Sequence, residues 1–212
     1  FTDSDGSSLA YEIERWVDDG SDNDSAWIWV RTPSIAGSNS SQYIRMYYGN
    51  TSAADSSCDS CVFDTSNGFR MVLHMTEEMG GTNNNDVYRN AAGLGHGEDD
   101  ISSTTQSSII GVAHDFDGDE DGIDVSHHDS YDGSDEHTLS AWIIPSHFTV
   151  ELDFGVIINN YNWDGALAVR GDSSVCTRVQ NTSSTIYEAQ SAAGVLTRNE
   201  PNFVTAVLTS AG

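Results

Sequence analysis

Short runs in which apolar residues alternate with polar ones recur along most of the chain. Leu9, Tyr11 and Ile13 are each separated by a polar or small residue, which is the period-two pattern of a half-buried strand. Six further runs are short and rich in β-branched or aromatic residues: 27–30, 43–48, 137–144, 148–154, 166–169 and 203–208. Clusters of Asp, Asn, Ser and Gly lie between the runs and favour turns. The pattern predicts an all-β protein built as a β-sandwich.

Convincing helical periodicity is missing from the chain. The best helical candidate, 71–79, is short and runs directly into two glycines. Residues 50–60 are polar enough to form a linker or a long loop between two units. We therefore expect two β units in succession, with a division near residue 60.

The charge balance excludes several classes of partner. The 212 residues include 33 Asp and Glu but only eight basic residues, all of them Arg, so the formal net charge is −25. Such a chain is repelled by phosphate backbones and by anionic lipid surfaces, which argues against nucleic-acid and membrane-surface partners. With 37% hydrophobic residues it is too apolar for a disordered acidic tail. No apolar run approaches the ~18 residues of a membrane span, so we expect no membrane insertion.

The absence of lysine gives the acidity a more specific meaning. At about 1 M salt the Debye length is about 3 Å, so carboxylates that repel one another in dilute buffer are screened. The long apolar stem of lysine would instead expose hydrocarbon that concentrated salt drives out of solution. A generally acidic protein, or one rich in calcium ligands, explains the charge but not the loss of every lysine. The composition therefore predicts a protein adapted to extreme salinity.

Three cysteines leave two interpretations of one short motif. Cys58 and Cys61 form a C-x-x-C on a stretch rich in Ser and Asp, and Cys176 stands alone. No second C-x-x-C or closely spaced Cys/His pair completes the four ligands of a zinc site. A thioredoxin-type redox site would have a strand before the motif and a helix after it, and neither is evident. The motif predicts a tight local disulfide, or else two buried or unpaired thiols.

Four Asn-x-Ser/Thr sequons lie in polar, turn-like segments. Their acceptor residues are Asn23, Asn39, Asn50 and Asn181. Glycosylation at such positions is typical of a secreted protein. A chain rich in Asn and Ser gains several sequons by chance, so they support secretion only weakly.

Several phrases resemble known secreted proteins. Residues 1–6, 9–14, 29–33 and 43–50 resemble, in this order, the second half of a small β domain of uncharacterised function. That family occurs in large secreted surface proteins of archaea and bacteria, typically just before a concanavalin A/laminin-G-like domain. The resemblance implies that residues 1–60 are the C-terminal part of a small β domain.

The rest of the chain resembles that neighbouring domain. The phrases are 72–77, 85–86 together with Asn90, 111–118, 123–125 and 138–145. They are similar to the front half of a laminin-G-like jelly roll, which implies that residues 61–212 are the front portion of such a fold. Relative to both families the chain is cut at its two ends, and missing strands leave backbone edges unpaired. We therefore expect a fragment of a longer polypeptide, or a subunit completed by strands of neighbouring chains.

One loop has the spacing of a calcium site. Asp117, Asp119, Asp121 and Asp124, with a glycine between the last two, spell D-x-D-x-D-G-x-x-D. Alternate carboxylates of this kind converge on one hard cation. His128 stands where a bidentate Glu would close the shell of an EF-type loop, and the laminin-G-like family carries an acidic hairpin here without needing metal. Calcium is therefore a possible cofactor of this loop.

An aromatic loop is the best candidate for contact with a sugar. Asn160, Asn162, Trp163 and Asp164 combine amides with an indole ring. Amides can hydrogen-bond sugar hydroxyls while the ring stacks on a C–H face. The alternative is that the loop caps the core with its tryptophan turned inward.

None of the candidate catalytic arrangements in the sequence is complete. Glu151 and Asp153 resemble the catalytic strand of laminarinase-type glucanases, but the acid/base carboxylate that should follow is replaced by an apolar residue. Without it, a retaining mechanism has no proton donor for the leaving group. His74 lies on an apolar run, where a histidine is more often a satisfied core residue than a ligand. We expect no enzyme.

These observations predict an extracellular, non-catalytic module from a halophile or one of its viruses. Its expected role is structural or adhesive, in a cell-surface, filament or virion assembly, with other protein subunits or glycans as partners. A calcium-dependent, lectin-like carbohydrate-binding domain is the alternative, and a glycoside hydrolase is a distant third.

Overall fold

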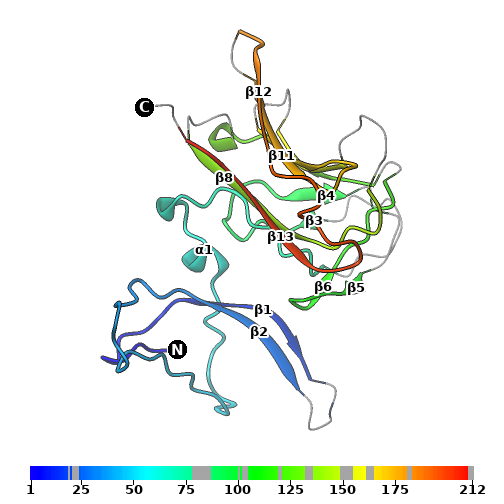
Figure 1. Ribbon diagram of the computed structural model, residues 1–212. Helices are drawn as coiled ribbons and strands as arrows, with labels where there is room; N and C mark the ends of the chain where they lie inside the picture. The colour runs from blue at the N-terminus through cyan, green and yellow to red at the C-terminus, as the bar shows by residue number, and fades with distance from the viewer. Residues whose placement is uncertain are drawn as a thin grey trace. The chain divides into compact units, whose positions relative to one another are not determined.

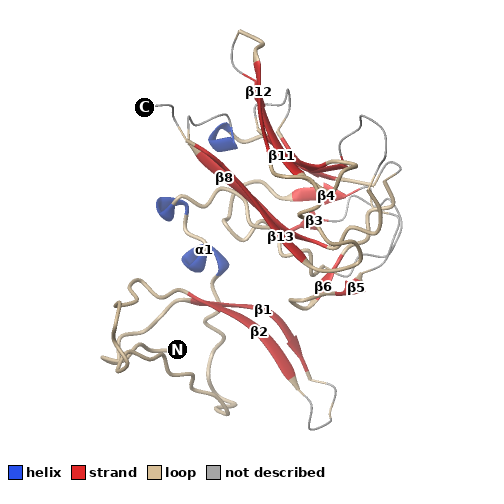
Figure 2. Cartoon of the chain, in the orientation of Figure 1, coloured by secondary structure: helices blue, strands red, loops and turns tan. Residues whose placement is uncertain are grey.

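The computed structural model describes residues 1–18, 20, 24–77, 87–99, 101, 105–118, 121–131, 136–148, 155–160, 165–180 and 183–209. The all-β prediction is confirmed, since almost all regular structure consists of strands in antiparallel sheets (Figure 2). The chain divides into two compact units, unit 1 (Phe1–His127) and unit 2 (His128–Gly212). The predicted domain boundary at residue 60 and the jelly-roll assignment remain predictions.

Unit 1 begins with an antiparallel hairpin of β1 (Tyr11–Val17) and β2 (Ser25–Val30). Its register pairs Tyr11 with Val30 and Val17 with Ser25, with an irregularity near Ile13. After a long exposed stretch come the short helix α1 (Asp59–Val62) and the 3₁₀ turn η1 (Thr65–Asn67). Figure 1 shows the hairpin in blue and α1 in cyan.

Two small sheets complete unit 1. One contains β3 (Val87–Tyr88), β4 (Gly97–Asp99) and β7 (Ile123–Val125), and the other pairs β5 (Gln106–Ser107) with β6 (Val112–Ala113). Gly97 is required where β4 meets β7, because a Cβ there would lie 2.5 Å from Ile123 Cγ2. Val62, Phe63 and Ala91 form the core cluster of this unit, with Ala10 and Val72 packed against it. The segment after β2 is thereby joined to the hairpin by apolar packing.

Unit 2 contains a larger sheet and a strand pair. The sheet has the order β12-β11-β10-β9, from β9 (Gly155–Asn159), β10 (Ala166–Val169), β11 (Val175–Gln180) and β12 (Ile186–Gln190). The 3₁₀ turn η2 (Asp129–Tyr131) precedes β8 (His137–Ile143), which pairs along its whole length with β13 (Asn202–Leu208). Antiparallel pairing joins strands far apart in sequence here, as expected of a sandwich rather than of consecutive hairpins.

The core of unit 2 lies between these two sheets. Leu167, Leu196 and Val204 are buried together, and side chains from β8, β9, β10, β11 and β13 pack against them. β8 alternates strictly between more and less exposed positions, so one of its faces covers this core and the other does not. Cys176 on β11 is buried and is a free thiol.

Most of the predicted strands correspond to observed ones, with one clear exception. The run 43–48 forms no strand: only Arg45 pairs, through an isolated bridge to Thr2 with N–O distances of 3.0 and 2.8 Å. In the described part of the chain no other segment lies beside this run as a pairing partner, and a strand needs one. The run 148–154 falls almost entirely outside the described residues. The weak helical candidate 71–79 is not helical over its described part.

Candidate functional site

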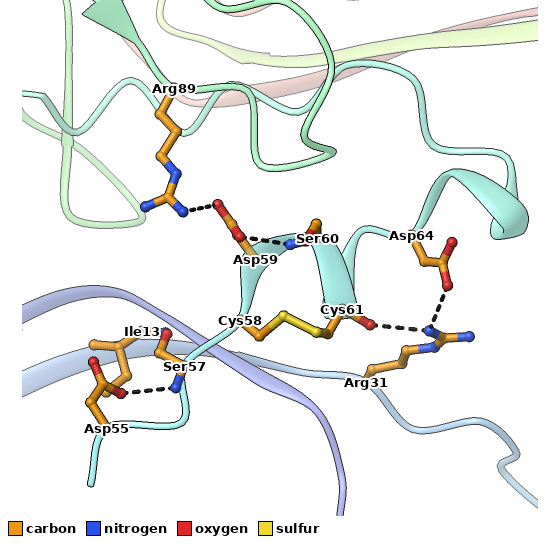
Figure 3. The surroundings of a disulfide bond; sticks show 10 residues. All are labelled: Ile13, Arg31, Asp55, Ser57, Cys58, Asp59, Ser60, Cys61, Asp64 and Arg89. Carbon is orange, nitrogen blue, oxygen red and sulfur yellow. Dashed lines mark hydrogen bonds and ion pairs between the residues drawn. A yellow bond between two sulfur atoms is a disulfide. The ribbon is translucent and has the colours of Figure 1, made fainter.

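A disulfide-bonded turn ties the hairpin of unit 1 to the segment that follows it (Figure 3). Cys58 and Cys61 are joined, with their Cα atoms 5.2 Å apart, so the structure selects the disulfide among the alternatives that the sequence left open. Just before α1, Cys58 N donates to Tyr11 O at 2.8 Å, and Ser57 Oγ accepts from Ile13 N at 2.8 Å. The turn therefore binds along β1.

Two of the eight arginines fix the other side of this turn. Arg31, just after β2, donates to the carbonyl of Cys61 at 3.0 Å and lies 3.3 Å from Asp64. Arg89 forms an ion pair with Asp59 in the first turn of α1 (Figure 3). The hydrogen bonds from Ser66, followed by that from Arg31, lower the pKa of Asp64. These contacts make the turn a structural connector.

We expect removal of this disulfide to destabilise unit 1 moderately. For a four-residue loop the chain-entropy model gives a loss of roughly 2 kcal/mol in the free energy of unfolding. A Cys58→Ser/Cys61→Ser variant should show this loss in thermal unfolding followed at high salt. A reductant should lower the Tm of the wild type to that of the variant and leave the variant unchanged. An unaltered wild-type Tm under reducing conditions would contradict the connecting role.

A second cluster in unit 1 surrounds His74 with carboxylates. His74 Nε2 lies 3.2 Å from Glu12 Oε2, and His74 Nδ1 lies 3.6 Å from Glu14 Oε2. Glu14 Oε2 also accepts a hydrogen bond from the indole N–H of Trp29 at 2.5 Å, and the Trp29 ring stacks on His74 with centroids 5.7 Å apart. The His74 side chain is only 12% exposed and that of Glu14 only 2%. The expectation of a satisfied, buried histidine is confirmed.

The electrostatics of this cluster favour a charged imidazole ring. Burial on its own lowers the pKa of His74, but the hydrogen bond and charge of Glu12, with the charges of Glu14 and Glu77, outweigh it and raise the pKa. Burial raises the pKa of Glu14, although the hydrogen bond from Trp29 and the charge of His74 oppose the shift. A protonated His74 is shared by two carboxylates with little exposure, and each member of such an ion cluster depends on the others.

A small pocket adjoins these charges. Its volume is about 100 Å³, and its lining includes Glu12, Glu14, His74, Glu77 and Arg89. Glu77 Oε1 accepts from the backbone N–H of Arg89 at 2.8 Å, whereas Glu77 Oε2 is buried and has no hydrogen-bond partner among the described residues. Small-molecule sites usually enclose about 300–1,000 Å³. This pocket is therefore too small to enclose a sugar ring together with the sugar units linked to it.

Sequence reasoning missed this cluster for an identifiable reason. The alternation of Leu9, Tyr11 and Ile13 placed the buried face of the strand on the apolar residues, yet Glu12 between them is buried. Both faces of β1 are partly covered in the folded unit. The available signal was His74 itself, because a histidine on an apolar run requires a polar partner from elsewhere in the chain.

The predicted calcium loop is described only in part. The Oδ2 of Asp121 accepts a hydrogen bond from the backbone N–H of Asp117 at 2.9 Å. Asp124 is exposed on β7 and lies opposite Glu98 on β4. Asp119 lies outside the described residues, and among those that are described no three His, Cys, Asp or Glu side chains are grouped to hold a metal. Calcium binding here remains a prediction.

The predicted sugar-binding loop is represented by Asn160 alone. Its Nδ2 donates to the carbonyl of Tyr131 at 2.9 Å and so connects the end of β9 to η2. Asn162, Trp163 and Asp164 lie outside the described residues, as do Glu151 and Asp153. The contact gives Asn160 a structural use, and sugar binding by this loop remains a prediction.

Two of the four sequon asparagines, Asn39 and Asn50, lie within the described residues. Asn39 Oδ1 accepts from the backbone N–H of Ser41 at 2.8 Å, and Asn50 Oδ1 accepts from that of Ser52 at 3.1 Å. Both asparagines are exposed in Asx turns, in keeping with the predicted turn-like character of these segments. Asn23 and Asn181 lie outside the described residues. Glycosylation remains a prediction at all four positions.

Large apolar side chains are exposed on both units. In unit 1 they cluster in the unpaired run after β2, which we call the tyrosine segment (Tyr43, Ile44, Met46, Tyr47 and Tyr48). Exposure reaches 68% for Tyr47 and 83% for Tyr48. In unit 2 the exposed residues include Trp142 on β8 and Phe203 on β13, whose ring centroids lie 5.1 Å apart. Trp142 and Phe203 thus form apolar surface that is contiguous, and such surface marks sites of interaction.

The fold and these sites define an all-β protein with exposed aromatic surface. Residues 1–76 match a family described as a domain of unknown function, DUF2341. The match agrees with the predicted domain of uncharacterised function at the start of the chain and extends past residue 60. No curated protein and no solved structure matches the chain significantly. Among the described residues, no helix has the length and apolar character needed to cross a membrane.

Proposed function

We propose that this chain is an extracellular structural or adhesive module of a cell-surface, filament or virion assembly in a high-salt environment. The observation that carries the proposal is the tyrosine segment, within the part that matches DUF2341. Its five apolar side chains are all at least 44% exposed. A monomer that functions alone rarely leaves such a run uncovered, whereas a module of an assembly uses it for contact.

The backbone of this segment supports the same role. Residues 43–48 belong to no helix or strand, and Arg45 supplies the pairing with Thr2 that holds them to the rest of unit 1. Arg45 also stacks over the ring of Tyr43, with its guanidinium carbon 4.8 Å from the ring centroid. A strand-like sequence with unpaired edge groups is suited to accept a neighbouring strand. The segment thus offers both apolar side chains and backbone groups to a partner.

The location outside the cell is supported by the disulfide. The Cys58–Cys61 bond closes a turn at the surface of unit 1, where reducing cytosol would tend to break it. The high-salt setting is supported by a net charge of −25 without lysine.

The proposal is tested by removing the exposed rings. A Tyr47→Ser/Tyr48→Ser variant should keep the wild-type Tm, since both side chains lie mostly in solvent, but should lose most of its incorporation into the native assembly. Incorporation is measured by immunogold labelling of intact source cells or particles that express the tagged full-length protein. A Ser40→Ala/Ser56→Ala variant, altered at exposed positions nearby that leave every sequon intact, is the matched control. Labelling that requires permeabilised cells, or equal incorporation of all three proteins, would overturn the proposal.

A further inference from the structure

The outer face of the β8–β13 pair is an uncovered part of unit 2. The register pairs Trp142 with Phe203, Ser140 with Thr205 and Thr138 with Val207. Their inward-facing neighbours, including Leu139, Ala141 and Val204, pack into the core. The six outer side chains, which we call the β8–β13 outer face, therefore all point away from it (Thr138, Ser140, Trp142, Phe203, Thr205 and Val207).

This outer face is largely apolar, and the rest of it is made of hydroxyl groups. Trp142 is 52% exposed, Phe203 57% and Val207 62%. The two aromatic rings contact each other at one end of the face, and the valine lies at the other end, four residues along β13. Burial of such rings is a large source of binding energy when a partner covers them.

Charge indicates which partner fits. None of the six side chains is ionisable, although 33 of the 212 residues are acidic. A second copy of the chain carries the same net charge of −25, so two copies can meet closely only where no carboxylate faces another carboxylate. A two-fold axis places a surface patch against itself, which a neutral patch permits and an acidic patch opposes.

We propose that the β8–β13 outer face pairs with the same face of a second copy, related by a two-fold axis. The inference rests on the proposed function, because it names one contact by which the module builds its assembly. Two pleated faces pack about 10 Å apart, a distance that lets the aromatic pair of one copy lie over the valine and hydroxyl groups of the other. Multimolar salt screens the acidic surfaces around the contact and strengthens its apolar part.

The test introduces one carboxylate at the centre of the face. Thr205→Glu should raise the Kd of the dimer by about 100-fold or more, because two desolvated carboxylates then face each other across the axis. Sedimentation equilibrium of the whole chain in multimolar salt measures the Kd. Ala193→Glu, an exposed turn position of the same unit, adds the same charge and should leave the dimer unchanged.

A charge-reversal pair makes the test specific for self-association. A mixture of the Thr205→Glu and Thr205→Arg proteins should form a mixed dimer, although the Glu variant alone does not. Equal Tm values of the variants establish that each is folded. A wild type that remains monomeric at the highest soluble concentration, or a Thr205→Glu dimer with unchanged Kd, overturns the inference. Binding of neutral dextran that is lost in Trp142→Ala would overturn it in favour of a glycan site. None of these outcomes decides the proposed function, which the tyrosine-segment variant tests separately.

Discussion

Transfer from multimolar to millimolar salt is expected to unfold the protein. Its 33 carboxylates face only eight arginines, so the folded state concentrates a net charge of −25 in a small volume. At about 10 mM salt the Debye length is roughly 30 Å, which lets charges repel one another across a whole unit. At multimolar salt the range falls to about 3 Å or less, and only direct neighbours still interact.

The β4–β7 pair illustrates where the repulsion acts. Glu98 lies directly opposite Asp124, and both side chains are exposed. Like charges in directly opposed positions of an antiparallel pair weaken the pairing. A short sheet has few other contacts to compensate, so we expect this part of unit 1 to separate early as salt is removed.

Circular dichroism during stepwise dialysis measures the expected unfolding. Glu98→Gln should lower the salt concentration at the midpoint, because it removes the opposed charge from the pair. Glu200→Gln removes one charge from an exposed loop of unit 2 and is the control. Sucrose at matched osmolality should fail to replace salt if screening is the cause. A Tm that is equal in molar and millimolar salt would contradict the proposed adaptation to high salinity.

Replacement of His74 is expected to have the largest effect of any single substitution near the hairpin. His74→Ala leaves Glu12 and Glu14 as buried carboxylates without the cation between them. Breaking a buried ion pair by removing one partner costs about 3–5 kcal/mol of unfolding free energy. Loss of the ring contacts with Trp29 and Phe63 adds to that cost. Thermal unfolding at neutral pH and high salt measures the total.

Two comparisons separate charge from packing at this position. His74→Phe preserves an aromatic ring but removes the cation, so it should remain strongly destabilised. Adding Glu12→Gln and Glu14→Gln to it removes the uncompensated charges and should recover much of the loss. Equal stability of His74→Phe and the wild type would show that the ring matters for its shape and not for its charge.

The pH dependence of unit 1 follows from the same cluster. The pKa of His74 is raised on folding, so its stabilising contribution is complete below about pH 6.5 and is lost as pH rises through the folded-state value. The pKa of Glu14 is also raised, so its contribution is complete below about pH 4.3 and likewise declines as pH rises. Unfolding curves measured from about pH 4.3 to alkaline pH should show a free energy of unfolding that falls as the pH rises. In His74→Phe the decline that begins near pH 6.5 should disappear.

The sequence predicted the fold class and several strands because alternation reports local burial directly. The run 137–144 and the run 203–208 meet this condition, and they pair over seven residues. The run 43–48, predicted as a strand from its β-branched and aromatic residues, pairs at Arg45 alone. A sequence pattern specifies a strand that could form a sheet, whereas pairing also requires a partner segment, which the pattern does not reveal.

The His74 cluster could not be predicted for a related reason. Glu12 and Glu14 lie on β1, and His74 comes some sixty residues later, beyond α1. Their proximity depends on the way the disulfide-bonded turn packs along β1, which no local pattern contains. The CxxC spacing itself allowed a disulfide, and the structure shows that the turn closed by this bond is hydrogen-bonded to the backbone of β1.

Because Cys58 is bonded to Cys61, the thiol of Cys176 can serve as a natural chemical probe of local opening. The chain has three cysteines, so once two are bonded only this thiol can react with an alkylating reagent. Its burial on β11 means that labelling requires the structure around this strand to open, and burial also raises the pKa of the thiol. The rate of alkylation, followed by mass spectrometry over a range of salt concentrations, would therefore measure how readily the structure around β11 opens, without any engineered label.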